Sequence, residues 1–255
     1  MYFPIPGCMN GVHLGCKFPV LLVVLPIITG VVFFGVPSQD NCELSFISFT
    51  FDDGYVSVYD VAYPILDQYG YTGTAFVVTN TIDAPGHMSQ EQLLALQSDG
   101  WEIGSHTNTH PDLTTLDTSN KTTEILGSKH TLSLRGFDIY SFASPYGKYD
   151  GETLNIIKWS GYNAHRKAVY LPDDYPWTLN DIRVIDPYQI EGMDVRAYTS
   201  VQKIKDEMLR AKEERKWLVL VFHRFNQDSE FSYTGSDFEE IVSYAHSLEY
   251  TGVTV

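Results

Sequence analysis

The chain has 255 residues, which is enough for one large domain or two small ones with a buried core. Its 32 acidic residues outnumber 17 Lys and Arg, giving a net charge of −15. Phosphate binding needs a basic surface, so this charge argues against a nucleic-acid partner. The cysteines are Cys8, Cys16 and Cys42. Only Cys42 follows residue 37, which excludes a disulfide within that part and a CxxC metal site.

The N-terminal part contains one long apolar run. Residues 18–36 read FPVLLVVLPIITGVVFFGV and carry no charge. A helix of that length would extend about 28 Å, close to the thickness of a bilayer core. Lys17 precedes the run and acidic residues follow it, so the positive-inside rule predicts a cytoplasmic N-terminus. We expect residues 1–37 to hold a cytoplasmic stub and a membrane anchor or cleaved signal, and residues 38–255 to be extracytoplasmic.

Beyond residue 38, strand-like and helix-like segments alternate. Strands are predicted over residues 44–51, 74–79, 101–105, 139–143, 217–222 and 252–255, with 162–169 and 181–185 as further candidates. Helices are predicted over residues 58–69, 89–100, 119–134, 152–160, 201–216 and 237–248. This alternation indicates an α/β fold with a parallel sheet and outer helices. The 218 residues after 37 are few for an eight-fold barrel, so a barrel with a missing or distorted unit fits better.

Two adjacent acids, Asp52 and Asp53, end the first predicted strand. Burying a charge without a partner is costly, and a metal ion would remove that cost. Gly54 permits the strand to break, so both carboxylates can approach one site. A solvated Asp-Asp-Gly turn is the plainer alternative.

His106 and His110 have i, i+4 spacing, which would place both imidazoles on one side of a helical turn. An isolated pair of this kind is often structural, and the residue after His106 is Thr107 and not Glu, which excludes the HExxH protease pattern. Two imidazoles and one carboxylate nevertheless match a catalytic zinc site with an open fourth position.

His223 follows the apolar strand at 217–222. A histidine there can be a simple polar end to a strand. The site needs a proton donor opposite a carboxylate base, and a histidine side chain is of the type that can supply one.

The motifs TFDDG, SHTNTH, FASPYG and LVLVFH occur in this order along the chain. In order and approximate spacing they resemble the polysaccharide deacetylases, also called NodB-homology or carbohydrate esterase family 4 enzymes, over about residues 44–255. The resemblance implies a distorted (β/α)7 barrel. The FASPYG and FHRF segments look most like the branch that deacetylates poly-N-acetylglucosamine. The implied activity is metal-dependent removal of N-acetyl groups from an N-acetylglucosamine-containing polysaccharide.

Carried over by position, the resemblance assigns roles to single residues. Asp52 matches the general base and His223 the general acid, while the backbone N–H of Tyr146 would help to hold the oxyanion. Pro145 and Tyr146 would also contact the substrate. The ligands of Zn²⁺, or of another divalent transition metal, would be Asp53, His106 and His110.

The chain departs from the family pattern in two places. Many members carry an arginine before the proline of the third motif, where it orients the base, but here the residues are Ala143 and Ser144. Arg183 is the candidate substitute. The Asp-Trp of the fourth motif is not recognisable either. Trp177 is a candidate for stacking on a sugar, as are Tyr175 and Tyr188, although ordinary packing would explain each of them equally well.

Other functions stay open at this stage. The same chemistry would serve acetylxylan or peptidoglycan as substrate. A catalytically weak or silent, membrane-tethered carbohydrate-binding protein would need no acid–base pair. A structural zinc domain would need a fourth protein ligand, and no cysteine stands at a suitable place.

Overall fold

The computed structural model describes residues 45–172 and 175–255. The predicted membrane segment at 18–36 and the predicted domain boundary at residue 37 lie outside these residues. Within the two described ranges, every helix is too short or too polar to cross a bilayer.

Within the described residues, seven parallel strands close into a barrel, which confirms the predicted (β/α)7 barrel. Each strand pairs with the next along the chain, and β1 and β7 pair from Ile47–Leu218 to Phe51–Phe222 to close the ring. The strands are β1 (Phe46–Phe51), β2 (Gly73–Val77), β3 (Glu102–Ser105), β4 (Ser141–Ser144), β5 (Ala164–Val169), β6 (Ile190–Asp194) and β7 (Leu218–Phe222). A short last strand, β10 (Thr251–Gly252), adds to the start of β1.

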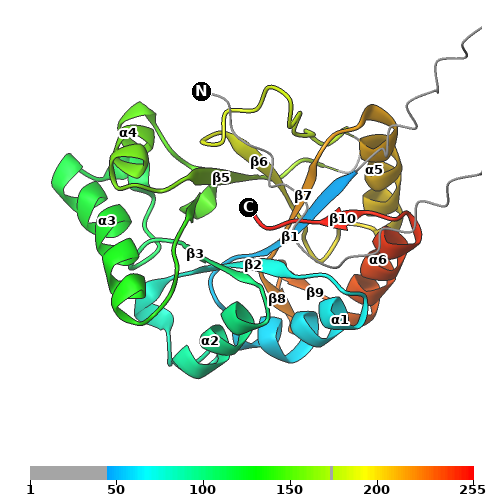
Figure 1. The fold of residues 1–255 in the computed structure, drawn as a ribbon, viewed down its shortest axis with the longest axis horizontal. Helices are drawn as coiled ribbons and strands as arrows, with labels where there is room; N and C mark the ends of the chain where they lie inside the picture. The colour runs from blue at the N-terminus through cyan, green and yellow to red at the C-terminus, as the bar shows by residue number, and fades with distance from the viewer. Residues whose placement is uncertain (1–44, 173–174) are drawn as a thin grey trace, which may run out of the picture. The chain divides into compact units, whose positions relative to one another are not determined.

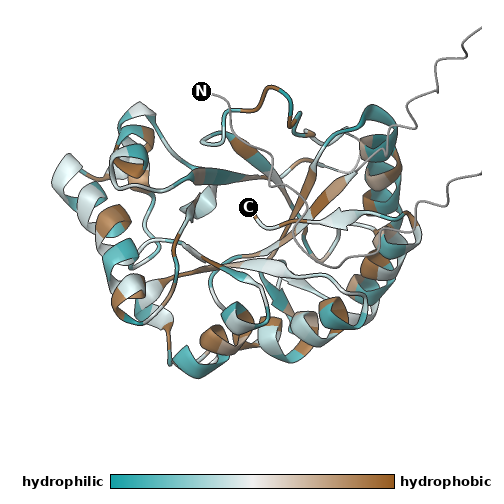
Figure 2. Cartoon of the chain, in the orientation of Figure 1, coloured by the Kyte–Doolittle hydropathy of each residue, from teal (hydrophilic) through white to brown (hydrophobic). Residues whose placement is uncertain are grey.

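In the described part of the chain, the α-helices lie around the outside of these strands (Figure 1). They are α1 (Tyr63–Gln68), α2 (Gln90–Ser98), α3 (Thr118–Leu134), α4 (Gly151–Trp159), α5 (Val201–Glu214) and α6 (Gly235–Ser247). Hydrophobic and hydrophilic residues alternate along each helix, as expected for helices with one buried face (Figure 2). The described part of the connection between β5 and β6, residues 170–172 and 175–189, contains no helix. This missing helix is the distortion of the barrel.

Aromatic side chains fill the space between β1, β7 and α6. The ring of Phe51 stacks on Trp101 with 5.3 Å between centroids, and Phe222 meets Phe238 edge-on at 5.0 Å. All four rings are buried. Burial of one such side chain stabilises the fold by about 1.5–3 kcal/mol. The cluster therefore holds β1 and β7 together directly below the residues that follow them.

Helix α2 begins at the N-cap serine that the sequence predicts. Ser89 caps α2 through the amide of Gln92, and the Gln92 side chain accepts from the Ser89 N–H, as its capping-box sequence predicts. The predicted single helix at 58–69 is divided into a π-helical turn, Val58–Ala62, and α1.

The strand predicted at 181–185 is wrong. Asp181 accepts hydrogen bonds from Arg183 and Lys216 in a turn, and Ile182 and Val184 are exposed. The sixth strand instead runs from Ile190 to Asp194. β-Branched residues favour a strand only where they pack on a neighbour, and these two side chains are largely exposed. The strand predicted at 252–255 is shorter than expected and ends at Gly252.

The connections after β2, β3, β4 and β7 contain small elements of their own. They are β8 (Arg224–Phe225), β9 (Ser232–Tyr233) and single 3-10 turns at Thr79–Thr81, Leu113–Thr115 and Pro145–Gly147.

Candidate active site

The carboxyl ends of the barrel strands surround a cavity of about 280 Å³. Parallel barrels present loop residues at this end, which is where barrel enzymes carry their chemistry. The cavity is lined by six residues that the sequence singles out, namely Asp52, Asp53, His106, His110, Tyr146 and His223. Residues that follow β1, β3, β4 and β7, far apart in the sequence, therefore share one site.

Asp53, His106 and His110 form a compact ligand triad. Oδ1 of Asp53 lies 3.3 Å from Nε2 of His110 and 3.6 Å from Nε2 of His106. One potential ligand atom from each residue lies within 4.8 Å of the others. Two nitrogens and one oxygen so close together can hold one divalent ion and leave coordination positions open.

The loop that carries the two histidines is not a helical turn, so the geometry expected from their i, i+4 spacing is wrong. Thr107 and His110 adopt left-handed backbone conformations, with φ of 70° and 62°. Asp53 does the same, with φ of 72°. Non-glycine residues seldom adopt this conformation, and it concentrates at functional sites. The left-handed residues turn the loop so that both imidazoles face Asp53.

Glu124 on α3 holds this loop in place. Its Oε2 accepts hydrogen bonds from the backbone N–H groups of Asn108, at 2.8 Å, and Thr109, at 2.9 Å. Its Oε1 accepts from the Thr109 hydroxyl at 2.7 Å. Hydrogen bonds to a carboxylate are stronger than those between neutral groups, so Glu124 fixes the segment between the two histidines.

His106 is prepared to bind a metal. Its Nδ1 lies 2.8 Å from the carbonyl oxygen of Ala143, which requires a proton on Nδ1 and leaves the Nε2 lone pair facing Asp53. Burial lowers the pKa of His106 to about 4, although the nearby Asp52 opposes this shift. A neutral imidazole is the form that coordinates metals. The triad therefore fits a transition metal such as zinc in both donor type and protonation.

Asp52 lies beside the triad and pairs with a residue that the sequence reasoning missed. Nη2 of Arg166, on β5, donates a short hydrogen bond to Oδ1 of Asp52, and both residues are buried. Burial alone would raise the pKa of Asp52, but the charge of the Arg166 guanidinium is the largest of the effects that outweigh it, and the pKa is lowered. Asp52 is therefore a carboxylate at neutral pH and is held in one orientation.

The prediction that Arg183 orients the base is corrected by this pairing. The Arg183 guanidinium is bound to both carboxylate oxygens of Asp181 on the exposed segment before β6. Arg166 occupies the position beside Asp52 instead. The sequence could have indicated Arg166, because it lies in the candidate strand at 162–169, where alternate residues share one face. Ala168 lines the cavity, and Arg166 is two positions before it.

His223 faces a second unpredicted residue. Nδ1 of His223 lies 3.7 Å from Oδ1 of Asp194, at the end of β6, which is too far for a hydrogen bond, and neither atom has a hydrogen-bond partner among the described residues. The other carboxylate oxygen of Asp194 accepts from Nε of Arg196 at 2.9 Å. Burial raises the pKa of Asp194, and the nearby His223 and Arg196 oppose that shift.

The third-motif turn places Tyr146 in the cavity but not Pro145. Tyr146 has φ of 57° and its ring meets His110 edge-on at 4.7 Å between centroids. Pro145 is buried and does not line the cavity. Trp177 is buried in the core, and its backbone N–H donates to Glu207, so it does not reach the site. The aromatic residues that do line the cavity are Tyr55, Tyr146, Tyr170 and Phe231.

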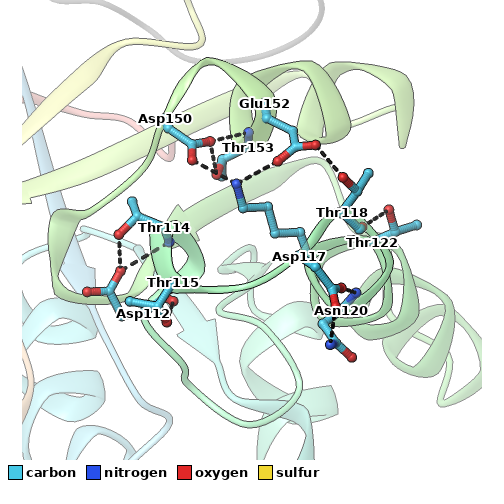
Figure 3. A network of polar contacts seen from close by, with 11 residues as sticks. Asp112, Thr114, Thr115, Asp117, Thr118, Asn120, Thr122, Asp150, Glu152 and Thr153 are labelled. Carbon is cyan, nitrogen blue, oxygen red and sulfur yellow. Dashed lines mark hydrogen bonds and ion pairs between the residues drawn. The ribbon is translucent and has the colours of Figure 1, made fainter.

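A polar network fixes the two loops that border the triad. Lys148, just after the Tyr146 turn, pairs at 2.7 Å with Asp112, just after His110. Deeper in the network, Lys121 on α3 contacts Asp150 at 2.7 Å and Glu152 at 2.8 Å. Figure 3 shows these two carboxylates at the start of α4, above the first turn of α3. The network thus ties α3 to α4 and the histidine loop to the Tyr146 turn.

Comparison with known proteins agrees with this geometry. Residues 41–165 match the family described as polysaccharide deacetylase. The chain is 34% identical over 114 residues to "Putative polysaccharide deacetylase YxkH" of Bacillus subtilis, covering 44% of this chain and 41% of that protein. It is 28% identical over 141 residues to "Poly-beta-1,6-N-acetyl-D-glucosamine N-deacetylase" of Staphylococcus aureus, covering 47% and 48%. The chain therefore spans about half the length of these curated relatives.

A solved structure extends the likeness of the fold to most of the chain. The Xyl-CE4 domain of a multidomain xylanase from the hindgut metagenome of Trinervitermes trinervoides matches with a TM-score of 0.60 and 22% identity. The match covers 83% of this chain and 88% of that domain. At this identity the likeness concerns the fold.

Proposed function

Because the chain carries a polysaccharide deacetylase domain, we propose that it removes N-acetyl groups from an N-acetylglucosamine-containing polysaccharide in a metal-dependent hydrolysis. The observation that carries this proposal is the division of roles in the cavity. Three residues form a ligand triad, while Asp52 and His223 lie outside it and are each held by a charged partner. A protein that only binds sugar has no use for such an acid–base pair, which disfavours a silent carbohydrate-binding protein.

The triad of Asp53, His106 and His110 would hold Zn²⁺ or another divalent transition metal. When bound, such an ion polarises an acyl carbonyl and lowers the pKa of a coordinated water towards about 7. The neutral state of His106 and the short distances to Asp53 favour its binding.

Asp52 would accept the proton of the attacking water. The carboxylate is available for this because Arg166 keeps its pKa low and fixes one of its oxygens. The other oxygen, Oδ2, lies 4.0 Å from Nε2 of His106 and so borders the ligand triad. A positioned general base of this kind contributes about 10²–10⁴-fold to a rate.

His223 would donate a proton to the departing amine, which is otherwise too basic to leave. The Asp194 carboxylate, 3.7 Å away, would stabilise the imidazolium form. The backbone N–H of Tyr146 would donate to the developing oxyanion, and one such donor is worth about 2.7–4 kcal/mol. The products would be acetate and a glucosamine unit.

We propose the poly-N-acetylglucosamine class of substrate first, because the FASPYG and FHRF segments resemble that branch and one relative bears that name. Acetylxylan and peptidoglycan are the competing substrates. The charge-free run at 18–36 supports an extracytoplasmic location, anchored or secreted, in which such polymers occur.

The test is acetate release by the purified 255-residue chain. β-1,6-Linked N-acetylglucosamine oligomers, acetylxylan and peptidoglycan would be compared after zinc loading and after chelation. We expect zinc-dependent release from the glucosamine oligomers, with a large loss in Asp52→Asn and no change in His130→Ala, an exposed histidine of α3. Zinc-independent release, or release from acetylxylan alone, would contradict the proposal.

A further inference from the structure

The segment between the two histidines of the ligand triad is bound to the barrel on the side opposite α3 as well. The backbone N–H of Thr79, which follows β2, donates to the carbonyl oxygen of Thr107 at 3.1 Å. The next N–H, of Asn80, donates to the carbonyl oxygen of Asn108 at 3.1 Å. The left-handed conformations of Thr107 and His110 are strained, and such strain persists only where surrounding contacts impose it. The histidine loop therefore depends on contacts from both sides.

The side chain of Asn108 joins these two sides. Its Oδ1 accepts a hydrogen bond from the Thr79 hydroxyl at 2.6 Å, and its Nδ2 donates to the carbonyl oxygen of Thr123 on α3 at 2.8 Å. Because one end of an amide accepts and the other donates, these two partners fix its orientation. The amide thus connects the end of β2 to α3 at a point between His106 and His110.

Gly127 on α3 gives this amide the space that it occupies. Glycine inside a helix is less favourable than alanine, so its presence there calls for a reason. A Cβ atom added at Gly127 would lie 2.9 Å from Nδ2 of Asn108, which is closer than real Cβ contacts. Alanine at this position would therefore displace the Asn108 amide from its hydrogen bonds.

We propose that Asn108 is a positioning residue for the metal ligands, and that its side chain requires glycine at position 127. Asn108 is not a member of the triad and acts through the loop, by fixing where His106 and His110 stand relative to Asp53. The inference rests on the metal site of the proposed function. Groups that orient metal ligands in this way typically contribute about 10–100-fold to metal affinity.

The experiment measures the zinc affinity of the 255-residue chain by competition with a chelator. We expect Asn108→Ala to bind zinc about tenfold more weakly than wild type, and Gly127→Ala to show a similar loss. Thr79→Val, which removes one of the two partners of the amide, should lose less. Asn155→Ala and Gly151→Ala, at exposed positions of α4, are the matched controls and should bind zinc as wild type does.

The double variant shows whether the two residues act together. Once Asn108→Ala has removed the amide, adding Gly127→Ala should weaken zinc binding no further. It should also raise the midpoint of urea unfolding, because alanine then favours the helix without a clash. The visible absorption of the cobalt-loaded protein reports the arrangement of the ligands. We expect it to change in both single variants, whereas a purely structural role would lower the unfolding midpoint and leave the spectrum as in wild type.

The outcomes separate this inference from the proposed function. Wild-type zinc affinity in both Asn108→Ala and Gly127→Ala would overturn the inference. So would an equal loss on adding Gly127→Ala with and without the Asn108 side chain, because Gly127 would then act on something else. A wild-type chain that binds no zinc would overturn the inference and the metal site together. A chain that binds zinc as expected but releases no acetate would overturn the proposed function alone.

Discussion

Arg166 on β5 and Asp52 at the end of β1 form a fully buried ion pair across the barrel, 114 residues apart in sequence. Two other guanidinium nitrogens of Arg166, Nε and Nη1, have no hydrogen-bond partner within the described residues. A buried arginine that is only partly satisfied is a poor way to stabilise a barrel, because its desolvation is costly. The pair is better explained by what it does to Asp52, which it keeps ionised and oriented beside the triad.

The first prediction follows from removing Arg166. In Arg166→Met the burial of Asp52 is no longer offset by the guanidinium, so the pKa of Asp52 rises. The base then becomes protonated at a higher pH, and the acidic limb of the kcat/KM profile moves to higher pH. We expect a loss of about 10–100-fold at neutral pH and a stability loss of about 3–5 kcal/mol, as for other broken buried pairs.

Arg183→Met serves as the control for that experiment, because Arg183 is exposed and bound to Asp181. It should leave the pH profile unchanged. An acidic limb that stays in place in Arg166→Met would show that Arg166 does not govern the protonation of Asp52.

The second prediction separates the base from the ligands. Asp52→Asn should lose about 10²–10⁴-fold in kcat while its zinc content stays near wild type, because Asp52 lies beside the triad and not in it. His106→Ala should lose both activity and zinc. The zinc content of the purified variants distinguishes a general base from a metal ligand. Equal zinc loss in the two variants would rule out this division of roles.

The third prediction concerns Asp194. In Asp194→Asn the carboxylate that faces Nδ1 of His223 becomes neutral, so the protonated imidazole loses its electrostatic support. We expect kcat to fall about tenfold with a smaller change in KM, because the proton donor loses the charged group that faces it. Glu230→Gln, which removes an exposed partner of Arg196 at 3.6 Å, should leave kcat unchanged.

Much of the barrel could be predicted from the sequence because its strands are apolar and its helix starts carry clear caps. Residues 217–222 and the Ser89–Gln92 capping box are examples. The wrong strand prediction concerns the segment between β5 and β6. Exposed Ile182 and Val184 have the composition of a strand, whereas the true strand β6 contains Gly192 and Asp194. Local propensity favours the first segment, but barrel pairing selects the second.

The residues of the candidate site that belong to sequence motifs could be predicted. The isolated residues that support them could not. The triad, Asp52 and His223 belong to recognisable motifs. Arg166 does not, because a charged residue inside a strand contradicts the usual hydrophobic pattern. Asp194 lies outside the segments for which the sequence predicts a strand. Both residues act through tertiary contacts that join strands distant in sequence, and spacing along the chain does not show such contacts.

A fourth prediction concerns stability at low pH. His165 is fully buried, with Nδ1 2.8 Å from the carbonyl oxygen of Tyr188 and Nε2 2.8 Å from the Ser144 hydroxyl. Burial lowers its pKa from 6.5 to about 4. The unfolded chain therefore binds the proton first, and the free energy of unfolding falls as the pH decreases from about 6.5 towards 4. One histidine contributes a slope of up to about 1.4 kcal/mol per pH unit.

Urea unfolding between pH 7.5 and 4.5 measures this slope. His165→Gln should make it shallower, while His130→Gln, at an exposed site, should not. His106 adds a similar slope in the metal-free chain, so all three proteins are compared without metal. Identical slopes in His165→Gln and wild type would refute a buried neutral His165.

The fifth prediction tests the path that Arg166 takes through the barrel. A Cβ atom added at Gly192, on β6, would lie 2.6 Å from Cγ2 of Val221 and 2.8 Å from Cδ of Arg166. Glycine at this position therefore leaves room for the arginine side chain to pass β6 and reach Asp52. Gly192→Ala should push Arg166 away, and overpacking of this kind costs about 1–3 kcal/mol.

The activity of Gly192→Ala should fall, and its acidic limb should move to higher pH in the same direction as in Arg166→Met, because both variants weaken one ion pair. Gly151→Ala is the matched control, since a Cβ there meets nothing within 4 Å. It should leave both properties unchanged. A Gly192→Ala protein that is destabilised but keeps the wild-type pH profile would show that Gly192 serves packing alone, and that Arg166 holds Asp52 without needing this gap.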